Sequence, residues 1–242
     1  MPAEPPTSEP TPSPFLEAAR GGCPDRVPIW FQRQAGRSLP EYRAVRGSGS
    51  ITEAILQPEL AAEITLQPVR RYGVDAAVLF SDIVTPVHAI GVDIDVVPGI
   101  GPVVEQPFRS RADLGRLRPL DPEADTPYVL ETIKAVISAT DVPLIGFAGA
   151  PFTVASYLIE GRPSRTYGAT KALMLGDEAL WFDLMEALGD LAIASIRSQV
   201  NAGARAVQLF DSWAGILSDA DYRRYVLPAS AKVLRGLADL DV

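Results

Sequence analysis

Short apolar runs alternate with helix-like segments along most of this chain, and this alternation constrains its fold more than any other feature. The apolar runs are VPIWF (27–31), DAAVLF (75–80), VPLIGFAG (142–149) and AVQLF (206–210). Segments with helical periodicity lie between and after them, at 58–72, 126–140, 152–160, 177–204 and 218–240. Strands that form unbroken apolar runs are typical of a parallel sheet covered by helices. The sequence therefore predicts an α/β fold with four parallel strands.

Smaller signals predict the local structure between these segments. FLEAARGG (15–22) predicts a short helix that ends at its glycines. Ser50 and Glu53 have the spacing of a capping box, which predicts a helix start, and Pro68 predicts a kink in the helix at 58–72. The alternating residues 92–105, with a turn at 98–101, predict a β-hairpin.

Two architectures fit this pattern, a doubly wound open sheet and a (β/α)8 barrel. Neither a G-x-G-x-x-G run after the first strand nor a Walker phosphate loop is present. Polar residues instead follow the strands: Arg33 and Arg37, then Ser81 and Asp82, then Asp211 and Ser212. Both architectures place their sites at the carboxyl ends of strands. A barrel needs eight strands, so we expect residues 15–242 to be the N-terminal part of a longer domain.

Composition excludes several classes of protein. The chain is 47% hydrophobic, which is too apolar for a wholly disordered protein, and its net charge of −8 argues against nucleic acid as a partner. Cys23 and His88, the single cysteine and histidine, favour neither a disulfide framework nor a structural zinc site. No apolar run reaches the ~18 residues of a membrane span. The proline-rich residues 1–14 predict a disordered tail without the features of a secretory signal.

The polar residues after the strands predict a site that works without a cofactor or metal. Arg33 and Arg37 suit an anionic substrate, and Asp82 suits a cationic or N–H-rich group. None of the three lysines follows a strand, which argues against pyridoxal chemistry. Structural roles remain open for the same residues: a helix cap for Asp82 or Ser212, loop ion pairs for the arginines, a core position for Tyr157 and a structural position for His88.

Four long blocks of the sequence resemble the uroporphyrinogen decarboxylase family. They are VPIWFQRQAGRSLPEYRAVR (27–46), PELAAEITLQPVRRYGVDAAVLFSDI (58–83), GFAGAPFTVASYLIEG (146–161) and QLFDSWAG (208–215), and they occur in the family's order. The resemblance implies a (β/α)8 TIM barrel that forms a homodimer, here with only its first four to five βα units. It also implies an enzyme of the bacterial cytoplasm that serves heme synthesis.

The resemblance implies a carboxy-lyase that uses no cofactor and no metal. Family members decarboxylate the four acetate side chains of uroporphyrinogen III to give coproporphyrinogen III. The motif match carries over a carboxylate-binding loop, a further arginine, an aspartate that accepts the pyrrole N–H groups, and two hydroxyl groups that bind carboxylates. In this chain they are Arg33, Gln34, Ala35, Gly36 and Arg37, then Arg46, Asp82, Tyr157 and Ser212.

Asp82 and Arg37 are the expected catalytic residues. A negative charge near the ring stabilises the cation that forms when a ring carbon is protonated, and either residue is a plausible route for the proton. Two departures from the family stand out. Ser38 occupies a position that is usually aromatic, and the family's C-terminal substrate-binding histidine has no counterpart here, since His88 does not match its setting.

Two other interpretations stay open. One is a non-catalytic tetrapyrrole-binding fragment. The other is a methyltransferase of the same superfamily acting on cobamides or in methionine synthesis, although Cys23 and His88 lack the spacing of its zinc ligands. A part of a barrel exposes strand edges, so we also expect the isolated chain to be marginally stable or prone to aggregation.

Overall fold

The computed structural model describes residues 13–32, 39–47, 49–97 and 99–242, and it has an α/β fold. Residues 1–12, most of the expected tail, lie outside the described part. The strands are β1 (Ala77–Val78), β2 (Ile94–Val97), β3 (Gly101–Val104), β4 (Leu144–Gly149) and β5 (Ala206–Phe210). The α-helices are α1 (Pro14–Ala19), α2 (Pro40–Arg46), α3 (Ile51–Ile55), α4 (Pro58–Tyr72), α5 (Thr85–Ala89), α6 (Pro122–Asp125), α7 (Pro127–Ala139), α8 (Pro151–Glu160), α9 (Gly168–Gly176), α10 (Glu178–Asn201), α11 (Asp219–Tyr225) and α12 (Leu227–Arg235).

Among the described residues, the central sheet has three parallel strands in the order β1-β4-β5. β1 pairs with the start of β4, and β5 pairs with β4 from Ile145 to Gly149. All six residues of β4 are buried, whereas those of β5 are half-buried. β4 is therefore the interior strand of this sheet, and strand order follows chain order.

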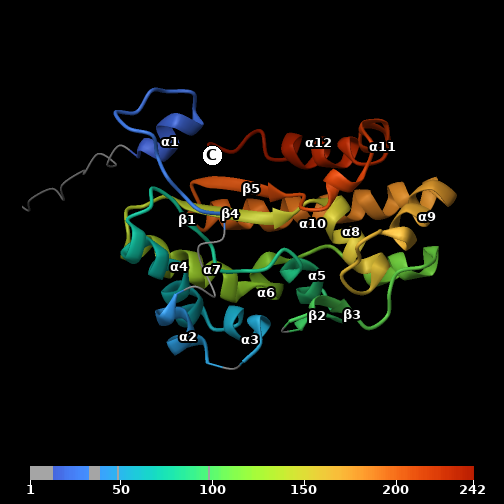
Figure 1. Cartoon of the computed structure of the whole chain (residues 1–242), viewed down its shortest axis with the longest axis horizontal. Coiled ribbons are helices and arrows are strands. Elements are labelled where there is room, and N and C mark those ends of the chain that lie inside the picture. The colour runs from blue at the N-terminus through green and yellow to red at the C-terminus, as the bar shows by residue number, and fades with distance from the viewer. Residues whose placement is uncertain (1–12, 33–38, 48, 98) are drawn as a thin grey trace, which may run out of the picture.

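Helices cover the sheet in the same chain order (Figure 1). α4 contacts β1 and α7, α7 contacts β4, and α10 contacts β4, β5 and α12. Figure 1 shows α11 and α12 on one side of the sheet and α4, α6 and α7 on the other. None of the helices in the described part is both long and apolar enough to cross a membrane.

A glutamine of α10 completes the hydrogen bonding of β4. The side-chain oxygen of the buried Gln199 accepts the backbone N–H of Phe147 at 2.8 Å, and its amide nitrogen donates to the Phe147 carbonyl at 2.8 Å. Gly146 allows this approach, because a Cβ there would lie 2.7 Å from the Gln199 oxygen. Gln199 thus satisfies the backbone N–H and carbonyl of Phe147 from a side chain.

The largest apolar cluster lies beside the sheet, between α5, α8, α10 and the β2–β3 hairpin. Trp181 is fully buried there, 6.1 Å from Phe152 in an edge-to-face contact, and its indole N–H donates to the Tyr225 carbonyl at 2.9 Å. The predicted hairpin is confirmed, with β2 and β3 antiparallel. The predicted capping box is also confirmed at the start of α3.

The predicted strand at 27–31 is wrong. Residues 27–31 form no strand, and the Asp75 N–H, just before β1, donates to the Ile29 carbonyl at 2.8 Å. Pro28 has no N–H, and the Ile29 N–H donates to the Asp75 carboxylate at 2.7 Å instead of to a carbonyl. Arg26 donates to the same carboxylate, with 2.8 Å between its Nη1 and Oδ2. The segment is therefore fixed to the start of β1 by a side chain.

Two further boundaries differ from the predictions. The strand expected at 75–80 is short, since only Ala77 and Val78 pair in the β4 register. The single helix expected at 218–240 divides into α11 and α12 around Val226, which has φ −121° and ψ −49°. Pro228 explains the break, because proline cannot donate to the preceding turn and disfavours a helical residue before it.

Candidate active site

Acidic residues follow the outer strands of the sheet at the same edge. Asp82 lies in the loop between β1 and α5, and Asp211 follows β5 directly. Between them, β4 ends in Gly149, and Ala150 donates its backbone N–H to the Phe210 carbonyl at 2.8 Å. Carboxyl ends of parallel strands converge at one edge of a sheet, so this edge is the candidate site.

Asp82 is half-buried and caps the turn that leads into α5. Its Oδ1 accepts the Val84 N–H at 3.0 Å, and its own N–H donates to the Thr85 hydroxyl at 3.3 Å. Burial raises the pKa of the Asp82 carboxyl, and hydrogen bonds from the backbone of Val84 and Ile83 offset part of that rise. Among the described residues, no arginine or lysine forms a salt bridge with Asp82.

Gly149 brings the Asp82 turn against the end of β4. A Cβ on Gly149 would lie 3.0 Å from the Ile83 Cβ and 2.6 Å from a Val154 methyl group. Only a residue without a side chain permits this packing. The small residues at the end of this strand therefore set the distance between Asp82 and β4.

A small recess adjoins Asp82 and includes Thr52, His88 and Tyr128 among its lining residues. His88 Nδ1 lies 2.8 Å from the Ile94 carbonyl oxygen and so joins α5 to β2. This contact gives His88 the structural position that the sequence left open. Within the described residues, no group of three or more His, Cys, Asp or Glu side chains is placed to hold a metal ion.

Asp211 is connected to the first turn of α8. The Thr153 hydroxyl donates to Asp211 Oδ1 at 2.7 Å and accepts the Trp213 backbone N–H at 3.2 Å. Asp211 Oδ2 and the Trp213 indole nitrogen are buried without a hydrogen-bond partner in the described part of the chain. Burial raises the pKa of the Asp211 carboxyl, while side-chain and backbone hydrogen bonds from Thr153 lower it.

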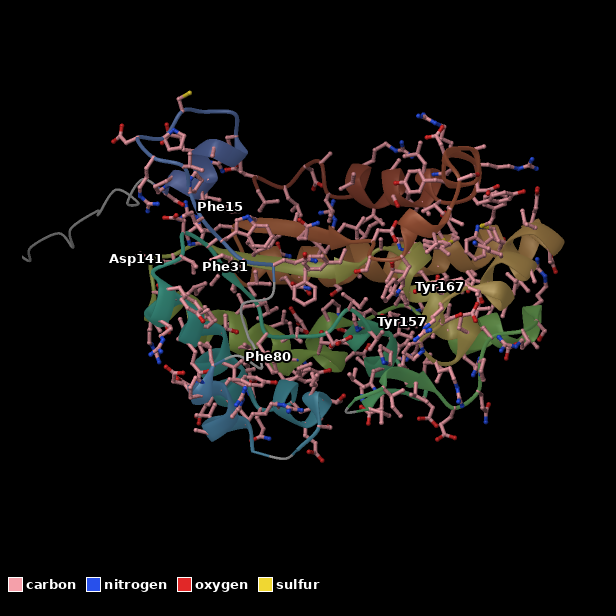
Figure 2. All side chains as sticks on the ribbon, in the orientation of Figure 1. Phe15, Phe31, Phe80, Asp141, Tyr157 and Tyr167 are labelled. Carbon is pink, nitrogen blue, oxygen red and sulfur yellow. The ribbon has the colours of Figure 1, made fainter. Side chains whose placement is uncertain are left out.

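An aromatic cluster places Tyr157 at this edge. The Trp213 ring lies 6.1 Å from Tyr157 in an edge-to-face contact and 5.7 Å from Tyr167. Figure 2 shows the two tyrosines close together, at the opposite end of the molecule from Asp141, which precedes β4. Burial raises the pKa of Tyr167 to about 12, with smaller contributions from Tyr157 and Glu160. Ser212 is exposed in the loop beside Trp213.

Arg46, at the end of α2, lies on the β1 side of the site. Its guanidinium stands 5.7 Å from the centre of the Tyr42 ring, and Tyr42 contacts Phe80 edge to face at 6.3 Å. Phe80 precedes Asp82 by two residues. Arg46 donates to the Gly49 carbonyl at 2.8 Å, while its Nε is buried without a partner in the described residues.

The structure thus groups the predicted residues into two sets. In the first set, Tyr157 and Ser212 lie near Trp213 at the ends of β4 and β5. In the second set, Asp82 follows β1, and Arg46 is connected to the same strand end through the contact of Tyr42 with Phe80. The predicted loop residues, Arg33, Gln34, Ala35, Gly36 and Arg37, lie outside the described residues, as does Ser38.

Sequence reasoning missed Thr153 and Trp213 and gave Asp211 no role. Asp211 did carry a signal, since it directly follows a predicted strand. The substrate-binding role was assigned instead to its neighbour Ser212, which matches the family motif. Thr153 lies in a segment with the pattern of an ordinary amphipathic helix, so its contact with a strand far along the chain had no local signal.

Comparison with known proteins identifies the family. The family model described as uroporphyrinogen decarboxylase (URO-D) matches residues 10–242. The chain belongs to the uroporphyrinogen decarboxylase family. It is 57% identical over 230 residues to a protein of Mycolicibacterium vanbaalenii named uroporphyrinogen decarboxylase, covering 95% of this chain and 65% of that protein. A protein of the same name from Salinispora tropica is 57% identical over 235 residues, which cover 97% of this chain and 63% of that protein.

A solved structure supports the fold independently. A methyltransferase from Methanosarcina mazei superposes with a TM-score of 0.72 at 24% sequence identity, covering 94% of this chain and 73% of that one. At this identity the likeness concerns the fold alone. The chain therefore has the α/β fold of a URO-D family member and spans less than two thirds of the length of the curated relatives named above.

Proposed function

We propose that this chain forms the N-terminal part of a carboxy-lyase that decarboxylates the four acetate side chains of uroporphyrinogen III to give coproporphyrinogen III. Family membership and the names of relatives at 57% identity support this proposal. The single observation that carries it is Asp82, a half-buried carboxyl at the end of β1 that forms no salt bridge within the described residues. A reaction that passes through a ring cation needs such a group.

The proposed reaction uses Asp82 as an electrostatic partner. Protonation of the pyrrole carbon beside an acetate gives an iminium-like cation, and the bond to the carboxylate then breaks. The bonding electrons form an exocyclic methylene as carbon dioxide leaves. A proton adds to the methylene and the ring proton is lost, so each acetate exchanges its carboxylate for one proton. A carboxylate held in a poorly solvated recess stabilises the cation more strongly than one in water.

The same carboxylate suits the centre of the substrate. The macrocycle presents four pyrrole N–H donors, and an ionised aspartate can only accept. Asp82 Oδ1 already accepts the Val84 N–H, which fixes the orientation of the side chain. Either Asp82 or Arg37 supplies the proton route in this proposal, and Asp82 has the advantage that burial raises its pKa.

The substrate's eight carboxylates require fixed cations and hydroxyl groups. We assign this role to Arg33 and Arg37 with Gln34, Ala35 and Gly36 between them, and to Arg46, Tyr157 and Ser212. Support for the last three comes from their positions around the ends of β1, β4 and β5. Arg46 has one guanidinium nitrogen donating to Gly49 and other donors to offer.

We also propose that residues 15–242 are part of a (β/α)8 barrel. Three parallel strands that neighbour one another in chain order, with helices that follow the same order, support this architecture. The homodimer, the cytoplasmic location and the absence of a cofactor in the proposal rest on the family resemblance.

One rival function has an observation in its favour. The second candidate is a tetrapyrrole-binding protein without turnover, since Arg46 and the Asp82 carboxyl would suit binding of a tetrapyrrole whether or not it reacts. An anaerobic assay with uroporphyrinogen III, with product carboxylates counted by mass, separates the two. Stepwise loss of carbon dioxide supports the enzyme, and binding without such loss supports the rival. A chain that shows neither binding nor loss of carbon dioxide contradicts both.

A further inference from the structure

Asp211 joins two elements that each carry a proposed substrate-binding residue. It accepts the Thr153 hydroxyl at 2.7 Å, and that hydroxyl accepts the Trp213 backbone N–H at 3.2 Å. We call Asp211, Thr153 and Trp213 the α8 clamp. The clamp fixes the first turn of α8 against the loop that follows β5.

The two substrate-binding residues lie directly beside this clamp. Tyr157 is four residues after Thr153 on α8, so both lie on the same face of the helix. Ser212 lies between Asp211 and Trp213. The Trp213 ring also contacts Tyr157 at 6.1 Å, which gives a second connection between the two elements.

Asp211 also lies at a helix end that has no cap of its own. The N-cap position of α8 is Ala150, which has no side-chain oxygen, and within the described residues no side-chain hydrogen bond caps this end. The Thr153 hydroxyl, in the first turn of α8, donates to Asp211 Oδ1 at 2.7 Å. A carboxyl group from the loop after β5 therefore lies at the first turn of the helix, and the positive end of the helix dipole favours a negative charge there.

We propose that Asp211 is a positioning residue that sets the separation between Tyr157 and Ser212 for binding of the substrate's carboxylates. This inference rests on the proposed decarboxylase function. Asp211 acts through Thr153 and Trp213 and does not touch the reacting ring, whose positive charge Asp82 stabilises in the proposed reaction. The energetic cost of its unpartnered Oδ2 and of the unpartnered Trp213 indole nitrogen, both judged among the described residues, is consistent with a constrained functional loop.

The test compares KM, kcat and amide hydrogen exchange in the full chain with uroporphyrinogen III as substrate. Thr153→Val removes the bridging hydroxyl, and we expect KM to rise about tenfold while kcat changes less than about threefold. Exchange in residues 211–213 should accelerate without substrate present. Thr153→Ser keeps the hydroxyl and should restore both values, whereas Asp211→Ala removes the acceptor and should raise KM as Thr153→Val does.

A matched control is Thr140→Val, at the opposite end of the sheet. Thr140 also accepts a backbone N–H, from Val142 at 3.2 Å, so its loss tests general destabilisation. It should leave KM unchanged even where the melting temperature falls. An unchanged KM in Thr153→Val, or an equal rise in Thr140→Val, overturns the positioning role.

Two further results would overturn the inference in distinguishable ways. If Asp211→Asn loses kcat at unchanged KM, Asp211 takes part in the chemistry itself. If the unmodified chain neither binds nor converts uroporphyrinogen III, the proposed function fails and the positioning role fails with it. In that case, faster amide exchange of residues 211–213 in Thr153→Val than in the unmodified chain still shows that the α8 clamp exists.

Discussion

Single residues at the strand ends serve structure and proposed chemistry together. Asp82 caps the turn into α5 with Oδ1, and Asp211 accepts the Thr153 hydroxyl from the first turn of α8. Both carboxyl groups have raised pKa values because of burial. A cap role and a site role are therefore not alternatives here, since the hydrogen bonds that satisfy the backbone also orient the carboxyl group.

Substituting Asp82 tests its charge while keeping its shape. Asp82→Asn retains an oxygen that can accept the Val84 N–H, so the fold should survive. We expect kcat to fall at least about 100-fold while binding of uroporphyrinogen weakens less than about tenfold, because the negative charge matters most when the ring becomes cationic. Separate binding and turnover measurements check this, and near-normal turnover would contradict the electrostatic role.

The lowered pKa of Asp75 predicts that part of the free energy of unfolding is lost in acid. Hydrogen bonds from Arg26, the largest cause, and from the Ile29 N–H lower the pKa of Asp75. The unfolded chain then binds the proton more readily, so this stabilisation is present above the unfolded value of about 3.9 and is lost as pH falls below it. Asp75→Asn should lose less unfolding free energy than the unmodified chain between about pH 5 and pH 3.

Urea unfolding at both pH values measures this effect. Asp25→Asn is the control, because Asp25 is exposed next to Arg26 and forms no salt bridge in the described residues. The control should keep the acid sensitivity of the unmodified chain. Equal sensitivity in Asp75→Asn would show that the ion pair contributes nothing.

At the level of elements, close packing fixes the turn that carries Asp82. Gly149→Ala places a Cβ 3.0 Å from the Ile83 Cβ and 2.6 Å from Val154. We expect a loss of about 1–3 kcal/mol of unfolding free energy from overpacking, and turnover should fall as the Asp82 turn moves. Gly115→Ala is a matched control because no atom of the described residues lies within 4 Å of its added Cβ. Similar values for both variants would contradict the close approach.

The elements were partly predictable from the sequence. β5, the β2–β3 hairpin and the start of α3 follow local patterns, and the structure confirms them. The segment 27–31 has the composition of a strand, yet it forms none. Pro28 has no N–H to donate to a neighbouring strand, and the Ile29 N–H donates to the Asp75 carboxylate. A carboxylate that competes for a backbone N–H depends on tertiary contacts, which periodicity does not reveal. For the same reason Asp82, Tyr157 and Ser212 could be proposed from motifs, whereas Thr153 could not.

At the level of the whole molecule, the outer edge of β5 affects how the chain associates with other copies of itself. In the described residues no strand pairs with that edge, and all five β5 residues are only half-buried. Unpaired edges favour association with other chains. We therefore expect the isolated chain to self-associate as its concentration rises.

A lysine on this strand should reduce that association. Gln208→Lys adds a charge to β5, and charged side chains on edges oppose edge-to-edge pairing. Light scattering at a series of concentrations should show smaller assemblies, whereas Gln57→Lys, at the exposed N-cap of α4, should leave assembly unchanged. A cooperative thermal transition with a constant monomer or dimer mass in the unmodified chain would contradict the prediction.

The strand order has a consequence for how the protein is made. Because β1, β4 and β5 neighbour one another in the order of synthesis, β4 leaves the ribosome after β1, and β5 leaves it after β4. The sheet can therefore grow by addition at one edge while translation continues, without waiting for a distant segment. Gln199 follows this order too, since it emerges after β4 and its side chain then hydrogen-bonds the Phe147 backbone.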